Sequence, residues 1–218
     1  MSRPLLLDLF CGQGGSAVGY WRAGFSVVGV DKDPQPNYPF PMVVGDALNP
    51  PFDPGDFDAI HASPPCQHFT AYGRAVKDIK TRYEDLIVPT RRLLERSRRP
   101  WVMENVVGAP LDAPVMLCGS MFRLDVQRHR LFEANWGLRQ ELKCDHKVWT
   151  PRFPPASNRT NLRKTVEVGV WRIPLDVQKQ AMGVDWDVTL RGLSEAVPPA
   201  YTEHIGGQLM AMFEARVA

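Results

Sequence analysis

The N-terminal half of the sequence alternates between short apolar runs and segments with glycine turns or helical spacing, and this alternation restricts the fold. The apolar runs have the length of strands, and they occupy residues 4–10, 26–31, 42–48, 56–63 and 101–106. Parallel strands must be joined by crossover segments such as helices, whereas antiparallel strands can be joined by tight turns. The spacing therefore predicts an α/β fold with a doubly wound, mostly parallel sheet.

Three further segments carry helical spacing. One lies within residues 81–97, although Pro89 should kink or interrupt it, because proline lacks the backbone N–H that a helix interior needs. The other two lie near 175–182 and 200–216.

The composition changes near residue 133. The chain has 218 residues, enough for one well-buried α/β domain with little left for a second. Residues 133–172 are rich in Arg, Lys, Asn and Pro and show weak periodicity, which predicts an irregular insert. We therefore expect a domain at 1–132, a small insert at 133–172 and a C-terminal segment at 173–218 that returns to the first domain.

The distribution of charge is more informative than its sum. The net charge is only +2, but basic side chains gather between Arg123 and Arg172 with few acids among them. Such a run is usually a solvated face, and it is equally typical of a surface that binds nucleic acid. Charge alone leaves both readings open.

The cysteines and the hydropathy favour a cytoplasmic protein without metal. The four cysteines are scattered and form no Cys-x-x-Cys pair. Cys144-Asp145-His146 is a weak metal pattern, and Cys118 reads as a buried apolar side chain, so we expect no metal. No leader opens the chain and no apolar stretch approaches the roughly 20 residues of a membrane helix, so we expect no membrane partner.

A glycine-rich loop follows the first predicted strand. In "DLFCGQGGSA", Gly12, Gly14 and Ala17 satisfy the spacing of dinucleotide-binding turns, where glycine lets the backbone approach a cofactor closely. Asp31 ends the second strand, where an acid can accept ribose hydroxyls, and Asp46 ends the third. Both acids are also common as turn or capping residues. The loop predicts an adenosine-bearing cofactor without distinguishing NAD from S-adenosylmethionine.

A cysteine lies where such a sheet places its reactants. Cys66, in "SPPCQHFT", follows the fourth predicted strand, and Glu104, in "MENV", ends the fifth. A free thiol has a pKa of about 8.5 and needs a base or cationic neighbours to become a nucleophile. Arg128 and Arg130 are candidates if the fold brings them close. A thiol, a carboxyl group and an adenosine cofactor suit covalent attack on an electron-poor ring with proton transfer.

The order of these motifs resembles that of the cytosine-5 DNA methyltransferases. The motifs are "DLFCGQGG", "SPPCQHFT", "ENV", "RHRLF" and "SEAVPPAYTEHIG", and they span nearly the whole chain. Adenine and N4-cytosine methylases place an aromatic residue after the two prolines, whereas this chain has a cysteine. The resemblance implies the Rossmann-like fold of S-adenosylmethionine-dependent methyltransferases, with a small target-recognition insert.

The resemblance also implies how the cofactor is held. Phe10, Gly12 and Gly14 would pack around S-adenosylmethionine, Asp31 would hold its ribose, and Asp46 would meet its adenine.

For the chemistry, the resemblance implies a covalent mechanism on a cytosine flipped out of the DNA. Cys66 would attack C6 of the ring, which makes C5 nucleophilic. Glu104 would contact N3 and the exocyclic amine, Arg130 would contact O2, and Arg128 would support the pocket near the thiol.

The implied partner is double-stranded DNA, bound by a monomeric protein in a bacterial or phage-infected cell, as in restriction-modification. The insert is short for this family, so we expect phosphate contacts and a short or relaxed target sequence. The residues assigned to substrate binding are Pro65, Gln67, Arg152, Arg159, Arg163 and Lys164.

Two motifs depart from the family pattern. The Gln-x-Arg-x-Arg motif has Val126 at its first position, with Gln127 displaced by one. The last motif, usually Gly-Asn-Ala-Val, has Glu195 in place of the asparagine, in a segment that returns to the cofactor site in this family. We hypothesise that Glu195 changes cofactor or product preference; the alternative is that it caps or pairs locally.

Two other functions stay open at this point. The same chemistry could act on tRNA cytosine, because both substrates present phosphates and an extrudable base. A non-catalytic DNA-binding relative is the third reading, although it would have no need for Cys66, Glu104 and both arginines together.

Overall fold

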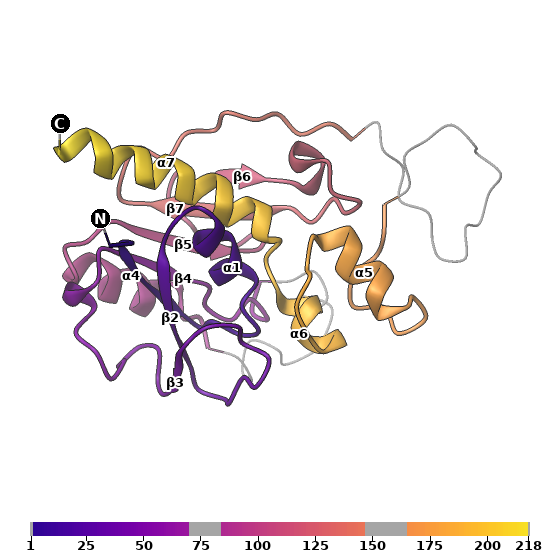
Figure 1. Ribbon diagram of the computed structural model, residues 1–218, viewed down its shortest axis with the longest axis horizontal. Coiled ribbons are helices and arrows are strands. Elements are labelled where there is room, and N and C mark those ends of the chain that lie inside the picture. Colours follow the sequence, from indigo (N-terminus) through magenta and orange to yellow (C-terminus); the bar gives the residue numbers. More distant parts are fainter. Residues whose placement is uncertain (1, 70–83, 147–164, 218) are drawn as a thin grey trace.

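The computed structural model describes residues 2–69, 84–146 and 165–217, and a mixed sheet forms its centre (Figure 1). Among these residues one seven-stranded sheet forms, with the order β3-β2-β1-β4-β5-β7-β6. Its parallel part consists of β1 (Leu5–Leu9), β2 (Ser26–Asp31), β3 (Met42–Val44), β4 (Ala59–Ala62) and β5 (Trp101–Asn105). The chain reverses direction in the order on either side of β1, so the predicted doubly wound, mostly parallel sheet is confirmed.

Two antiparallel strands at one edge were not predicted. β6 (Val115–Leu117) pairs with β7 (Arg130–Ala134), and β7 pairs with β5. Arg130 and Glu133 interrupt the apolar pattern of β7, which hides the strand in the sequence. Each finds its counter-charge on another element, at Glu104 and Arg91 respectively. The sheet therefore continues to Ala134, past residue 132, where we had expected the first domain to end.

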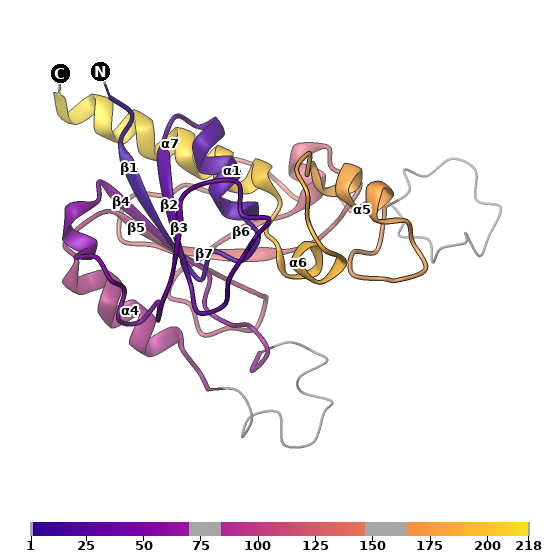
Figure 2. The ribbon, with the colours of Figure 1, turned by 60° about the horizontal axis from the view of Figure 1, so that its bottom comes forward.

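Helices cover both faces of the sheet. Figure 2 shows α1 (Gly15–Arg22) and α7 (Pro199–Val217) together on one face and α4 (Ile87–Arg96) on the other. Alternate residues of β1 supply the two cores: Leu6 packs in the cluster that contains residues of α1 and α7, whereas Leu7 and Leu9 pack in the cluster that contains residues of α4. This alternation follows from the two-residue period of a strand.

The predicted interruption at Pro89 is wrong. α4 begins at Ile87, which places Pro89 in the first turn. Backbone N–H groups in the first turn of a helix have no acceptor within it, so proline costs nothing there. Asp85 receives a hydrogen bond from the backbone N–H of Ile87, 2.9 Å away, and so satisfies one of these donors.

The C-terminal region adds two short helices beside α7. α5 (Leu175–Met182) has the predicted bounds, and α6 (Leu190–Glu195) follows it. Met182 and Leu193 are fully buried in a small core of their own that also contains Val126. The remaining helical turns are the 3-10 helices η1 (Pro54–Asp56) and η2 (Gly119–Phe122).

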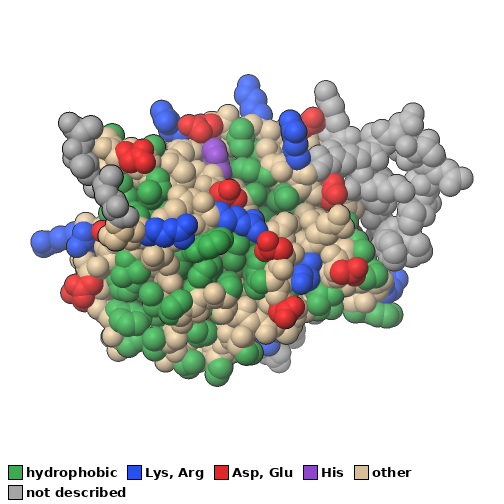
Figure 3. All heavy atoms as spheres, viewed as in Figure 1, with side chains coloured by type: hydrophobic (Ala, Val, Ile, Leu, Met, Phe, Trp, Pro, Cys, Tyr) green, Lys and Arg blue, Asp and Glu red, His purple; other side chains and the backbone are tan. Residues whose placement is uncertain are grey.

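The described surface has two further properties. Among the described helices, none combines the length and the apolar character that crossing a membrane requires. On the face drawn in Figure 3, Lys and Arg side chains are interspersed with Asp and Glu, and the described residues of that face form no wide area of one charge.

α1 and α7 pack closely because Gly19 has no side chain. A methyl group on Gly19 would overlap the Thr202 hydroxyl and the carbonyl oxygen of Pro199. The Thr202 hydroxyl instead donates to the carbonyl of Ser16 over 2.9 Å, which ties the last helix to the first.

We expect Gly19→Ala to lower the free energy of unfolding by about 1–3 kcal/mol, because the added methyl group forces the two helices apart. Gly207→Ala is the matched control: Gly207 is exposed in α7, and its new methyl group would meet no other atom. Alanine has a higher helix propensity than glycine, so Gly207→Ala should raise the free energy of unfolding by about 0.5–1 kcal/mol. Urea denaturation checks both, and equal effects from the two substitutions would contradict the packing argument.

A buried carboxyl group in β1 predicts a pH effect on stability. Asp8 is buried and receives a hydrogen bond from the Tyr38 hydroxyl over 3.2 Å. Burial raises the pKa of Asp8 to about 8, against about 3.9 in an unfolded chain. The folded state therefore binds more protons between these values, and stability falls as the pH rises from about 4 to about 8.

We expect Asp8→Asn to remove this loss, because an amide does not ionise. Its free energy of unfolding should rise relative to the wild type between pH 5 and pH 7.5, with a limiting slope of about 1.4 kcal/mol per pH unit. Urea denaturation at several pH values is the measurement, and Asp185→Asn is the control, since that side chain is 77% exposed. Parallel curves for Asp8→Asn and the wild type would contradict a buried, protonated Asp8.

Candidate active site

The loop after β4 is fixed to the end of β5 by an asparagine of the "ENV" motif. The buried side-chain amide of Asn105 donates to the carbonyl oxygen of Pro64 over 2.8 Å. Two residues later Cys66 is half-buried, in a turn closed by the hydrogen bond from the N–H of Phe69 to its carbonyl oxygen, 2.9 Å away. Prolines hold φ near one value, so this contact and the two prolines together fix the position of the thiol.

A carboxylate and a guanidinium form a buried ion pair beside this loop. Nε of Arg130, the first residue of β7, lies 3.0 Å from Oε1 of Glu104 in β5. Their side chains are only 14% and 7% exposed. Strands β5 and β7 are neighbours, and a buried charge needs such a partner to offset the loss of solvent.

A chain of buried hydrogen bonds reaches Glu104 from the other side. The Ser63 hydroxyl donates to the Glu104 carboxylate, and Nε2 of His61 lies 2.9 Å from the Ser63 oxygen. Nδ1 of His61 lies 3.1 Å from the Tyr20 hydroxyl. Burial lowers the pKa of His61 to about 3, so the ring is neutral and has one donor and one acceptor. With Ser63 donating to Glu104, Nε2 of His61 carries the hydrogen and Nδ1 accepts from Tyr20.

The charges of this cluster act on the thiol. Burial and then the Glu104 carboxylate raise the pKa of Cys66, whereas Arg130 and Arg128 lower it. Burial also raises the pKa of Glu104, against the effect of Arg130 and the hydrogen bond from Ser63. The structure therefore brings together Cys66, Glu104, Arg128 and Arg130, which lie up to 64 positions apart in the sequence.

Arg128 connects this cluster to the C-terminal segment. Its guanidinium donates to the carbonyl oxygen of Ala196 over 2.9 Å and to that of Ser194. The Tyr201 hydroxyl donates to the carbonyl oxygen of Arg128 over 2.8 Å. Burial and then Arg130 lower the pKa of Arg128 to about 9, so it stays charged at neutral pH. Within the described contacts its side-chain hydrogen bonds go to the backbone of the C-terminal segment.

A pocket of about 430 Å³ opens beside the two arginines. One wall contains Arg128 and Arg130, and the facing wall comes from the segment that precedes α5. The lining residues are Val126, Gln127, Arg128, Arg130, Thr165, Val166, Glu167, Val168 and Val170. The sequence did not indicate residues 165–170, because no motif marks them.

The glycine loop lies at the same edge of the sheet and leaves space in front of its backbone. Gly12 has φ +49°, and a methyl group on it would meet no other atom. Phe10 also has positive φ, of 59°, which is uncommon for a side chain of its size. Such a turn lets a ligand approach the backbone closely.

The two predicted cofactor acids end neighbouring strands. Asp31 accepts hydrogen bonds from the N–H groups of Gly12, at 2.9 Å, and Asp33, at 3.1 Å. Asp46 is exposed and accepts from the N–H of Leu48 over 2.9 Å. A carboxylate has about four acceptor positions, so both acids retain some for a ligand. The open space beside Gly12 and acids at the ends of β2 and β3 fit an adenosine group.

The segment that contains Glu195 packs against this loop. The side chain of Gln13 donates to the Thr189 hydroxyl over 3.1 Å and accepts from the Thr189 N–H over 2.8 Å. Glu195 itself lies at the end of α6 and pairs with Arg191 at 3.1 Å, with its side chain 54% exposed. This is the local pairing that we kept as the alternative to a cofactor role.

The remaining predicted substrate residues divide into two groups. Pro65 and Gln67 flank Cys66 and are half-buried like it. The other four lie outside the described residues, namely Arg152, Arg159, Arg163 and Lys164. Asn105, Ser63 and His61 were not among the predicted site residues. The "ENV" motif signals only Asn105, because Ser63 and His61 act through contacts across strands.

Comparisons with known proteins agree with this geometry. Residues 5–110 match the family model of the C-5 cytosine-specific DNA methylases. Type II methyltransferase M.AgeI of Thalassovita gelatinovora is 32% identical over 120 residues, covering 47% of this chain and 28% of that protein. M.XorII of Xanthomonas oryzae pv. oryzae is 34% identical over 126 residues, covering 50% of this chain and 29% of that protein. The chain thus spans less than a third of the length of either relative.

The fold comparison extends over the whole chain. The crystal structure of S. pombe Dnmt2 methyltransferase has a TM-score of 0.58 to this structure, with 14% sequence identity. It covers 97% of this chain and 99% of that one, so the two proteins share a fold of Rossmann-like methyltransferase type. The matched motifs in their expected order, the sheet and the relatives agree: residues 5–110 of this chain are similar to the C-5 cytosine-specific DNA methylases.

Proposed function

We propose that this chain transfers a methyl group from S-adenosylmethionine to C5 of a cytosine in DNA, through a covalent bond between Cys66 and C6 of the ring. The observation that carries the proposal is the buried Glu104–Arg130 pair beside Cys66. A thiol, a carboxyl group and a guanidinium at the edge that also carries the glycine loop match the needs of this reaction.

The side chains divide the proton and electron movements between them. The Cys66 thiolate forms a bond to C6. The electron pair of the C5–C6 double bond shifts onto C5 and makes C5 nucleophilic. Glu104 contacts N3 and the exocyclic amine of the ring and stabilises the charge that builds up there. Arg130 holds Glu104 in place and offers a further N–H to O2 of the cytosine. After C5 is methylated, loss of its proton restores the double bond and expels Cys66.

The cofactor supplies an electrophilic methyl group when it is bound. Gly12, which has open space in front of it, would allow its close approach and Phe10 would pack against it, whereas the side chain of Pro39 fills the space beside Gly14. The carboxylates of Asp31 and Asp46 would accept hydrogen bonds from its ribose and adenine. The Asp31 hydrogen bond to Gly12 already fixes the loop relative to β2, so little rearrangement is needed on binding.

The cytosine must leave the DNA stack to reach Cys66, at a cost of a few kcal/mol. Pro65 and Gln67 lie next to the thiol. The pocket beside Arg128 and Arg130 is large enough for one base, and its lining includes Arg130 but neither Cys66 nor Glu104. We propose that the basic residues Arg152, Arg159, Arg163 and Lys164 contact phosphates and offset part of this cost.

Transfer of labelled methyl groups from S-adenosylmethionine tests the proposal. We expect the wild type to label duplex DNA, and Cys66→Ala to lose the activity by about 10³-fold or more, because no other described group replaces the nucleophile. Glu104→Gln should lose about 10²–10⁴-fold. Equal activity of Cys66→Ala and the wild type would exclude the covalent mechanism.

The same assay separates the alternatives. Preferential labelling of tRNA in a mixture with duplex DNA would assign the chemistry to RNA, and no labelling of either would favour a binding role. Mass spectrometry of the product base tests the Glu195 hypothesis: plain 5-methylcytosine made efficiently from S-adenosylmethionine rejects it.

The charge arrangement makes a separate prediction about the thiol. The Glu104 carboxylate raises the pKa of Cys66. Glu104→Gln removes that charge, so we expect the pKa of Cys66 to fall and its alkylation by iodoacetamide at pH 8 to become a few times faster. The measurement is the pH profile of Cys66 alkylation, followed by peptide mass spectrometry.

Glu133→Gln is the matched control. Glu133 is also buried and paired with an arginine, Arg91, but its carboxylate does not contribute to the pKa of Cys66. The alkylation profile of Cys66 in Glu133→Gln should match that of the wild type. A Cys66 profile that moves to higher pH in Glu104→Gln would contradict the arrangement.

A further inference from the structure

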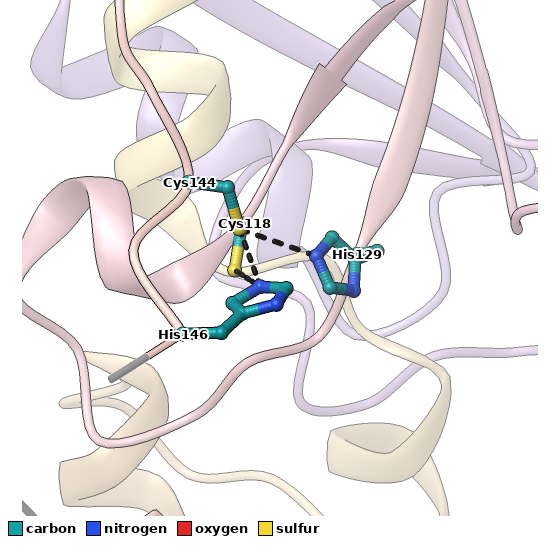
Figure 4. Close-up of side chains that lie close together, drawn as sticks. All are labelled: Cys118, His129, Cys144 and His146. Atoms are coloured by element: carbon teal, nitrogen blue, oxygen red, sulfur yellow. Dashed lines mark hydrogen bonds between the residues drawn. The ribbon is translucent and has the colours of Figure 1, made fainter. Parts of the chain in front are cut away.

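Two cysteines and two histidines meet at the edge of the sheet, outside the proposed catalytic cluster. Figure 4 shows the side chains of Cys118, His129, Cys144 and His146 converging on one point. One ligand atom from each residue lies within 4.8 Å of every other. Cys118 follows β6, His129 precedes β7, and the other two lie in the irregular segment after β7.

Two of the distances between these atoms suit a tetrahedral metal ion, whereas Sγ of Cys144 and Nε2 of His146 lie closer together, at 2.5 Å. Sγ of Cys118 lies 3.7 Å from Nε2 of His146, and Nε2 of His129 lies 3.4 Å from Sγ of Cys144. Zinc bonds of about 2.3 Å to sulfur and about 2.0 Å to nitrogen place tetrahedral ligand atoms about 3.3–3.8 Å apart. Two thiolates and two neutral imidazoles also balance the charge of a divalent ion.

The surroundings of the sulfur atoms support ligation. The Ser120 hydroxyl donates to Sγ of Cys118 over 3.2 Å and lies 3.6 Å from Sγ of Cys144. The same hydroxyl oxygen accepts from the N–H of Asp145 over 3.1 Å, which holds the Cys144 loop against η2. Groups that orient and hydrogen-bond the ligands are a regular part of metal sites.

We propose that Cys118, His129, Cys144 and His146 bind one zinc ion in a structural site. Four protein ligands fill a tetrahedral shell and leave no position for water or substrate, which distinguishes structural from catalytic zinc. Sulfur and nitrogen ligands in this geometry favour zinc over magnesium or calcium, which prefer oxygen.

The position of the site indicates what the ion stabilises. His129 lies between Arg128 and Arg130, and Cys144 and His146 lie immediately before residues 147–164. The ion would tie the end of the 135–146 segment to the end of β6 and the start of β7, which already pair with each other. It would thus fix the backbone of the arginine motif without touching the reacting atoms.

This inference replaces our expectation that the chain binds no metal. In the sequence Cys144 and His146 form only half a site, and Cys118 and His129 are eleven positions apart, without a recognised zinc spacing. The antiparallel pairing of β6 with β7 brings Cys118 to His129, and the hydrogen bond between Ser120 and Asp145 holds the Cys144 loop beside them.

The metal content of the purified protein tests the proposal. We expect about one zinc per wild-type chain by elemental mass spectrometry after dialysis against a weak chelator. His146→Ala removes the exposed ligand, which is the change least able to disturb folding, and should reduce the retained zinc about tenfold or more. His204→Ala is the matched control, because it removes a partly buried histidine outside the cluster and should retain one zinc.

A second measurement on the wild type does not depend on the folding of a variant. Cobalt exchanged into the site should give the visible absorption of a tetrahedral ion together with a thiolate-to-cobalt band, and both should survive in Cys66→Ala. Loss of zinc from the wild type on mild dialysis, together with cobalt spectra that lack the thiolate band, would overturn the proposal. Equal zinc in His146→Ala and His204→Ala would overturn it as well.

Discussion

The buried ion pair between Glu104 and Arg130 is the interaction on which the site depends. It lies between two adjacent strands, and removing either partner would leave a buried charge without compensation, which typically costs about 3–5 kcal/mol. Glu104 is also the end of the chain of hydrogen bonds through Ser63, His61 and Tyr20. The pair therefore holds the carboxyl group in one position and sets the field at Cys66.

The C-terminal segment contacts the glycine loop, the first helix and the arginine motif. Arg128 donates to the backbone at 194 and 196, Gln13 exchanges hydrogen bonds with Thr189, and α7 packs against α1 at Gly19. These contacts join residues up to 186 positions apart. Packing of the C-terminal segment thus holds the glycine loop and the arginine motif in position relative to each other. Such long-range contacts are needed because local structure alone cannot fix groups at the ångström level.

The proposed zinc site and the ion pair act on the same strand from two directions. Arg130 at the start of β7 pairs with Glu104, and its neighbour His129 belongs to the zinc cluster. The short strand β6 has only three residues, of which Leu117 is buried in the main core. A zinc ion at the proposed site would add a second connection between this edge of the sheet and the segment that follows β7.

The central parallel strands, the glycine loop and the edge at which Cys66 and Glu104 lie could be predicted from the sequence. These follow from short-range patterns: apolar runs, glycine spacing and the rule that parallel strands end at one edge. The sequence did not determine β6 and β7, the hold of Asn105 on Pro64, the pairing of Glu195 with Arg191 or the meeting of Cys118 with His146. Charged residues interrupt the apolar pattern of β7 and so hide that strand. The other features are contacts between residues from different segments, which no local pattern marks. They become visible in the folded structure, because the pKa and the contacts of a charged group or a thiol depend on the partner that the fold places beside it.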